Sequence, residues 1–267
     1  MHNKRSVSAY GASFRRKQTF QKALLAVTIL VFLSLLPVIY LNLRGRSSNE
    51  RRELQFFFES GAFEKAYTQS REMLKEKPLD FFLLTIHGFA SYQLAIAQIN
   101  NFNTLSYVDE CIWSLRKALL LREGSSDGRV SYVLGKAYFY KGTGYADLAV
   151  KYLEKARAAA YKAADIPEYL GLAYAVIRDF RSSVAAFTLA LTGDDVSGSS
   201  PSDVLLLSIA RSYLGLDEIE SAKAYLVRCL DISRDSRTIS AARLLLGGIL
   251  FKAGDIPGAE AEYLKVI

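Results

Sequence analysis

The sequence is poor in the residues on which most enzyme and metal sites depend. It contains only two histidines, His2 and His87, and two cysteines, Cys111 and Cys229, among 267 residues. No CxxC pair, P-loop or HExxH motif occurs, and His87 has no cysteine, serine or acid at a meaningful spacing. We therefore expect no enzymatic activity, no metal and no cofactor. His87 and both cysteines are expected to be packed residues, a disulfide being the alternative for the cysteines.

The positive charge of the chain is confined to two short segments. Residues 1–22 contribute +6 and residues 44–52 contribute +3 to the formal net charge of +7, which leaves −2 on residues 53–267. A protein that binds nucleic acid needs a basic face on its folded part. We therefore expect no nucleic-acid partner. The 51% of hydrophobic residues excludes a disordered chain and permits a sizeable core.

One uncharged apolar run, Ala23–Leu43, lies between the two basic segments. As a helix it would extend about 31 Å, close to the ~30 Å hydrocarbon core of a bilayer. The alternative is a cleaved signal peptide, but the run is too long for one and no small-x-small cleavage site closes it. The sequence thus predicts a single-pass transmembrane helix (23–43) between a basic tail (1–22) and a basic juxtamembrane linker (44–52).

The basic flanks also predict an orientation. Six lysines and arginines precede the apolar run and four follow it, which favours a cytoplasmic N-terminus and an extracytoplasmic remainder, as in a bacterial inner-membrane protein. The alternative, with residues 53–267 in the cytoplasm, stays open because both flanks are basic. The tail is expected to act as the orientation signal and to contact anionic lipid, and the alternative is a cytoplasmic docking segment.

Residues 53–267 repeat a helical pattern. Small residues recur in the first helix of successive units, at Gly88, Gly135, Gly171, Ala210 and Gly247. A second column of small residues marks the second helices, at Ala66, Cys111, Ala149, Ser183, Ala222 and Ala259. Four residues after each of these stand Ser70, Leu115, Leu153, Phe187, Leu226 and Tyr263. Where two helices cross, a small residue lets their backbones approach closely.

These columns resemble the tetratricopeptide repeat, an antiparallel helix pair of 34 residues. The resemblance implies an all-α fold, a right-handed α-solenoid of about six helix-turn-helix units over 53–267. The second unit carries an insertion near 95–108, which predicts longer helices or a protruding loop. Ser200 and Asp165 are predicted N-caps, and Gly193–Ser200 is a predicted linker. The sequence stops within the last second helix, so we expect either a partner that covers this end or a longer natural chain.

In this family a concave groove is lined by first-helix residues that point away from the second helix. The resemblance therefore implies a partner-binding groove formed by Phe82, Phe89, Tyr92, Tyr132, Lys136, Phe139, Tyr140, Glu168, Leu172, Val176, Leu207, Arg211, Leu214, Phe251 and Lys252. The alternative for many of these aromatic residues is the core within each repeat. A stripe of aromatic rings with isolated cations suits an extended peptide that carries a few acids or a free carboxylate.

The layout is similar to that of single-anchor periplasmic tetratricopeptide proteins that attend secretion or envelope machinery. We expect a membrane-anchored protein–protein interaction scaffold or chaperone-like adaptor that binds a protein or peptide partner in envelope protein traffic or complex assembly. The alternative is a structural, self-assembling homo-oligomer. Its basis is an uncovered C-terminal end that would expose Leu250, Tyr263 and Ile267.

Overall fold

The computed structural model describes residues 48–97, 104–121, 127–192 and 202–266. The chain divides into two compact units, Met1–Ser60 and Gly61–Ile267. The described part of the first unit is one helix, residues 48–59. The predicted tail (1–22) and transmembrane helix (23–43) lie outside the described residues, and the predicted linker (44–52) runs into this helix. Among the helices that the structure describes, none combines the length and apolar character needed to cross a bilayer.

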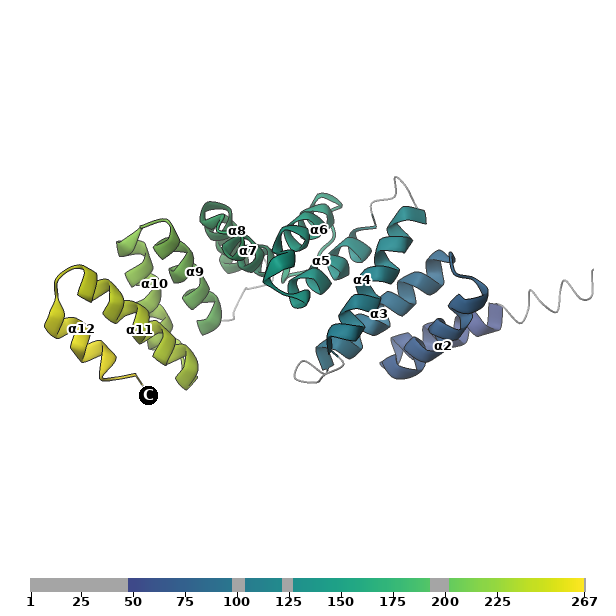
Figure 1. Ribbon diagram of the computed structural model, residues 1–267, viewed down its shortest axis with the longest axis horizontal. Coiled ribbons are helices and arrows are strands. Elements are labelled where there is room, and N and C mark those ends of the chain that lie inside the picture. The colour runs from purple at the N-terminus through teal and green to yellow at the C-terminus, as the bar shows by residue number, and fades with distance from the viewer. Residues whose placement is uncertain (1–47, 98–103, 122–126, 193–201, 267) are drawn as a thin grey trace, which may run out of the picture. The chain divides into compact units, whose positions relative to one another are not determined.

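The second unit is a succession of helices that pack in pairs in chain order (Figure 1). The helices are α2 (Phe63–Glu76), α3 (Phe81–Ala97), α4 (Thr104–Leu121), α5 (Gly128–Lys141), α6 (Ala146–Ala158), α7 (Ile166–Val176), α8 (Phe180–Thr192), α9 (Asp203–Gly215), α10 (Ile219–Ile232), α11 (Ser236–Lys252) and α12 (Ile256–Tyr263), with a 3₁₀ turn η1 (Thr143–Tyr145). The expected all-helical, tetratricopeptide-like solenoid is confirmed for the described residues. Its right-handedness stays a prediction.

The small residues of the first helices lie against the residues of the second helices that stand four positions after the second column of small residues. A Cβ added to Gly171 would lie under 3.0 Å from the ring of Phe187, which is fully buried. The same close approach pairs Gly88 with Leu115, Gly135 with Leu153, and Gly247 with Tyr263. At these four crossings the large side chain of the second helix occupies the space that a Cβ would take. In the α9/α10 pair an alanine, Ala210, holds the corresponding position and packs in one cluster with Leu226.

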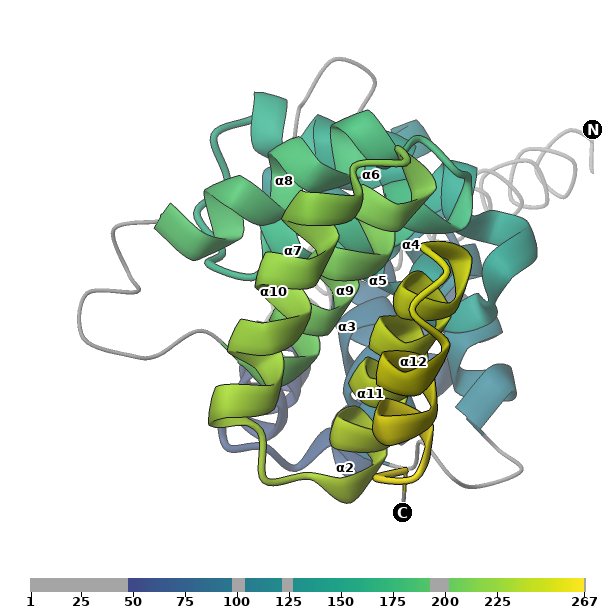
Figure 2. The same cartoon turned by 90° about the vertical axis from the view of Figure 1, so that its left-hand side faces the viewer.

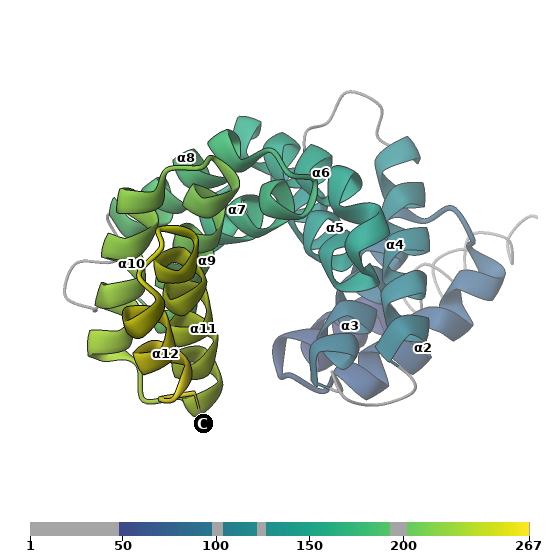
Figure 3. The same ribbon diagram turned by 60° about the vertical axis from the view of Figure 1, so that its left-hand side comes forward.

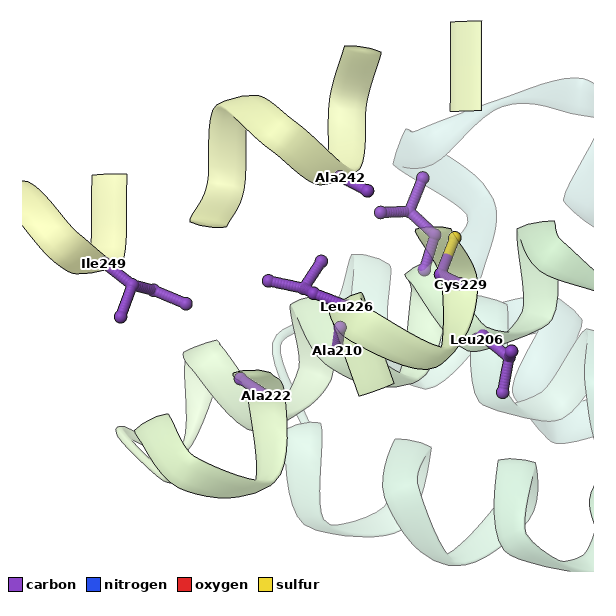
Figure 4. Close-up of a cluster of buried hydrophobic side chains, with 8 residues drawn as sticks. Leu206, Ala210, Ala222, Leu226, Cys229, Ala242 and Ile249 are labelled. Carbon is purple, nitrogen blue, oxygen red and sulfur yellow. The ribbon is translucent and has the colours of Figure 1, made fainter. Parts of the chain in front are cut away.

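Successive pairs share buried residues, as the stacking of a repeat array requires. Figure 4 shows such a cluster, in which Leu206 and Ala210 of α9 meet Leu226 and Cys229 of α10. Ala242 and Ile249 of α11 belong to the same cluster, so α11 packs against both α9 and α10. In Figure 2 the end of the molecule that contains α9, α10, α11 and α12 faces the viewer. Both cysteines are buried and free, as expected.

The first helices also contact one another, so that α3, α5, α7, α9 and α11 make a continuous row. In Figure 3, α5, α7 and α9 lie next to each other along this row. Some side chains of these helices are covered neither by the second helix of their own pair nor by the neighbouring pair. They lie on one common face of α3, α5, α7, α9 and α11, which we call the first-helix face.

Three local predictions can be compared with the helices. The insertion of the second unit lengthens α3 and α4 to 17 and 18 residues, whereas α5 and α6 have 14 and 13; residues 98–103 lie outside the described part. The predicted N-cap of α9 is wrong: Ser202 caps this helix by accepting from the backbone N–H of Leu205 at 3.1 Å. The linker Gly193–Ser200, which includes the predicted cap Ser200, and Ile267 also fall outside the described residues.

Candidate functional site: a tyrosine–lysine cluster on the first helices

A polar and aromatic cluster joins three consecutive first helices. It consists of Tyr92 of α3, then Tyr132, Lys136, Phe139 and Tyr140 of α5, then Asp165 and Tyr169 at the start of α7. We call these residues the tyrosine–lysine cluster. Tyr132, Lys136 and Tyr140 stand four residues apart, which places them on one side of α5.

An ion pair forms the centre of the cluster. Lys136 Nζ donates to Oδ2 of Asp165 at 2.7 Å and to the hydroxyl of Tyr132 at 3.1 Å. The hydroxyl of Tyr132 donates to both carboxylate oxygens of Asp165, at 2.8 and 2.9 Å. Lys136 is only 9% exposed, and its ammonium lies 4.3 Å from the ring centre of Tyr169. The lysine is therefore neutralised and enclosed by its own protein.

Asp165 does not cap α7 with its side chain, although its sequence position predicts this. It stands directly before α7, with Pro167 in the first turn, as a predicted N-cap should. Its side chain, however, makes no capping hydrogen bond. The carboxylate bonds instead to Tyr132 and Lys136 of the preceding repeat. The predicted cap is thus an inter-repeat bond, because a charged and buried lysine is the stronger partner.

The phenol groups are held in the neutral form. Burial, followed by the hydrogen bond to Asp165, raises the pKa of Tyr132 far above its ordinary value. Burial and the bond to Tyr140 do the same to the pKa of Tyr169, and the two hydroxyls are 2.8 Å apart. Tyr92 is 5% exposed, and burial likewise raises its pKa. Tyr132, Tyr140 and Tyr169 are only partly buried and can offer neutral rings to a ligand, whereas Tyr92, a predicted groove residue, belongs to the interior.

Glu168 lies beside the cluster, in the first turn of α7, and is partly buried. Burial is the main cause that raises the pKa of its carboxyl group, with the charge of Asp165 second. The positive charge of Lys136 opposes this shift but does not cancel it. Glu168 is thus the acid of this region whose charge is least compensated.

The other predicted groove residues do not join the cluster. Phe89 is 4% exposed and belongs to the interior, because the guanidinium of Arg129 covers its ring at 4.6 Å. Leu214 packs against the α9/α10 core. The remaining candidates are half-buried or exposed on their own helices: Phe82, Leu172, Val176, Arg211, Phe251 and Lys252. Leu207 is buried.

Sequence reasoning missed two members of the cluster. The sequence predicts Asp165 as an N-cap and gives no role to Tyr169. The signal available for Tyr169 is its position four residues after Asp165, which places both side chains on the same side of α7. For Asp165 no local signal exists, since its partners lie 29 and 33 residues away.

A second polar cluster surrounds His87, for which the sequence showed no partner. Its Nδ1 lies 2.9 Å from the hydroxyl of Ser70, and its Nε2 lies 3.2 Å from Oε2 of Glu110. The ring of Tyr67 stacks on it at 4.9 Å. Serine, histidine and acid are the types of a hydrolytic triad, but Ser70 is completely buried. The Ser70 hydroxyl is therefore closed to solvent, and the cluster lies where α2, α3 and α4 pack together.

A separate cavity of about 170 Å³ opens where α7 meets α6 and α8. Its walls include Glu154, Arg157, Leu170, Tyr174 and Leu189. Glu154 is occupied there: Arg157 pairs with it at 2.6 Å, and the hydroxyl of Tyr174 donates to it at 3.0 Å. Burial and this bond raise the pKa of Tyr174 to about 12. Over the same described residues, no three His, Cys, Asp or Glu side chains gather where they could hold a metal ion.

Comparison with known proteins agrees with the paired helices of the fold. A tetratricopeptide repeat family model matches residues 205–236, which correspond to α9, α10 and the turn that follows. No curated protein matches the chain in sequence.

Several solved structures are similar in fold. MamA protein is 20% identical with a TM-score of 0.52, over 69% of this chain and 90% of that chain. BtubC from P. vanneervenii is 18% identical with a TM-score of 0.55, over 80% and 89%. Pseudomonas aeruginosa pilF is 17% identical with a TM-score of 0.50, over 82% and 89%. At such identities the likeness concerns the fold alone. The described helices thus have the fold of tetratricopeptide-repeat proteins, and residues 205–236 match one such repeat in sequence.

Proposed function

We propose that this protein is a membrane-anchored interaction scaffold or chaperone-like adaptor, which binds a protein or peptide partner on the first-helix face. The observation that carries the proposal is the tyrosine–lysine cluster. It places partly exposed phenol rings on the row of first helices, and tyrosine is enriched where proteins bind one another. The tetratricopeptide-like fold is consistent with a binding role.

The cellular setting of the proposal rests on the sequence. The uncharged run 23–43 between basic flanks is the motivation for a membrane anchor, and the excess of positive charge before it favours extracytoplasmic repeats. We propose a role in bacterial envelope protein traffic or complex assembly. A reporter enzyme active only in the cytoplasm, fused after the last residue, should be inactive. Activity of that fusion would place the repeats in the cytoplasm.

Site-specific photo-crosslinking in cells tests the binding face. A photoreactive phenylalanine analogue at Tyr140, which is partly exposed within the cluster, should give adducts with another protein. The matched control is Lys155, which is exposed on the second helix α6. Glu154 is a poor control, because it lines the separate cavity. Equal adduct patterns from Tyr140 and Lys155 would contradict the proposed face.

Self-association is the second candidate, and exposed apolar side chains on the last two helices favour it. Leu244 and Phe251 of α11 are 51% and 58% exposed, and Ile256 of α12 is 52% exposed. A second copy would bury these groups and gain the corresponding hydrophobic free energy. If this candidate is correct, the mass of the solubilised protein will rise with concentration. The substitution Phe251→Ser should abolish that rise, whereas a constant monomer mass removes this option.

A further inference from the structure

The cation of the tyrosine–lysine cluster is not free to bind a partner. Lys136 is 9% exposed, and it already pairs with Asp165 at 2.7 Å. A carboxylate from outside would have to displace Asp165, which Tyr132 also holds. This argues against the expectation, drawn from the sequence, that Lys136 receives an acid or a free carboxylate. A charged side chain other than Lys136 must therefore pair with the partner on the first-helix face.

Glu168 supplies that charge. Within the part of the chain that the structure describes, no hydrogen bond or ion pair reaches its carboxylate. Partial burial and the nearby charge of Asp165 both disfavour its ionised form, as the raised pKa shows. A carboxylate that is partly removed from water and left unpaired gains free energy when a cation approaches it. Residues 53–267 carry a net charge of −2, so long-range electrostatics also favours a basic partner.

The surroundings of Glu168 suit a particular kind of cation. Glu168 stands in the first turn of α7, three residues after Asp165, which places both acids on the same side of the helix start. Tyr140 and Phe139 contact the ring of Tyr169, at centroid distances of 6.2 and 5.3 Å. Aromatic faces attract guanidinium and ammonium groups, arginine more often than lysine. Lys136 already shows this behaviour inside the protein, since its ammonium lies against the Tyr169 ring.

We propose that the first-helix face binds an extended segment of a partner protein through a basic side chain, preferably arginine. The cationic group pairs with the carboxylate of Glu168, and the alkyl stem lies on the neighbouring tyrosine rings. This inference rests on the proposed peptide-binding function and specifies the chemistry of the partner. It requires specificity for positive charge at one position of the bound segment.

Selection from a phage-displayed library of random peptides on the full-length protein tests the inference. The wild-type protein should enrich peptides that carry arginine or lysine at one position. For the best such peptide, Glu168→Gln should weaken binding about tenfold, as expected when one partner of a partly buried charge pair is removed. Glu168→Lys should select acidic peptides instead. Glu260→Gln, the same change at an exposed site on α12, should leave binding unaltered.

The outcomes separate this inference from the proposed function. Every selected peptide is tested for crosslinking to a photoreactive residue at Tyr140. Peptides that crosslink there without a preference for basic residues, or that bind Glu168→Gln as tightly as the wild type, would overturn the role of Glu168. The peptide-binding face would stand in that case. If no selected peptide crosslinks from Tyr140, the proposed face itself is wrong.

Discussion

Lys136 of α5 and Asp165 at the start of α7 are joined by an ion pair of 2.7 Å, which connects the first helices of two consecutive repeats. The apolar clusters of the array join the helices of a pair and also the second helix of one pair to the first helix of the next. This bond is different, because it is polar and lies directly on the first-helix face. The residues that shape the candidate site are thus also residues that hold two repeats together.

Loss of the Asp165 carboxylate should destabilise the array. Asp165→Ala leaves the buried ammonium of Lys136 without its acid and Tyr132 without its acceptor, so we expect the free energy of unfolding to fall by about 1–3 kcal/mol. Adding Lys136→Met removes the unpaired charge and should recover part of that loss. Urea unfolding followed by circular dichroism measures both variants. A double variant less stable than Asp165→Ala would contradict this account.

A Cβ at Gly171 should disturb the α7/α8 pair. The methyl group of Gly171→Ala would meet the ring of Phe187, which is fully buried and cannot move away. Overpacking of this kind costs about 1–3 kcal/mol of unfolding free energy. The control is Gly144→Ala in η1, where nothing lies within 4 Å of the added carbon. Thermal unfolding of both variants should show a lower midpoint for the first alone.

Arg178 lies in the left-handed region with a φ of 65°, in the turn between α7 and α8. Gly254, with a φ of 83°, holds the corresponding place between α11 and α12. An L-residue is disfavoured there by about 1–2 kcal/mol, so Arg178→Gly should stabilise the protein by roughly 0.5–1 kcal/mol. Arg228→Gly inside α10, at an exposed position, should instead destabilise it by about 1 kcal/mol. Equal effects of the two changes on chemical unfolding would refute this reasoning.

The pH dependence of stability should identify Glu168. Its pKa is raised in the folded state above the ordinary value of 4.5, so its contribution to stability is present at low pH and is lost as the pH rises through the folded-state pKa. Glu168→Gln avoids this loss. The variant should therefore melt at a higher temperature than the wild type at neutral pH, and the difference should shrink toward pH 4.5. A difference in melting temperature that is constant with pH would show that the pKa of Glu168 is not raised in the folded protein.

His87 should give a pH dependence of the opposite sign. Burial lowers its pKa below 6.5, although Glu110 partly opposes this shift. The folded protein then binds a proton less readily than the unfolded chain, so stability should fall as the pH drops below about 6.5. In His87→Leu the stabilities at about pH 7 and pH 5.5 should differ less than in the wild type. His2→Ala is the control and should keep the wild-type difference.

The repeat architecture was predictable from the sequence because its determinants are local and periodic. Gly135 and Leu153 stand in recurring columns, and these columns proved to be the two sides of each helix crossing. The insertion of the second unit was visible as extra length, but the sequence did not decide between longer helices and a protruding loop. Helix length depends on whether the added turns find neighbours to pack against, which a single sequence does not show.

The sequence by itself determined the helix pairs, the small residues at their crossings and the side of α5 that carries Tyr132, Lys136 and Tyr140. Only the tertiary structure decided that Lys136 is enclosed and neutralised, that Asp165 serves the preceding repeat instead of its own helix, and that His87 has polar partners. Hydrophobic periodicity is encoded within one helix, whereas the partner of a buried charge is chosen among side chains that stacking brings together from distant positions.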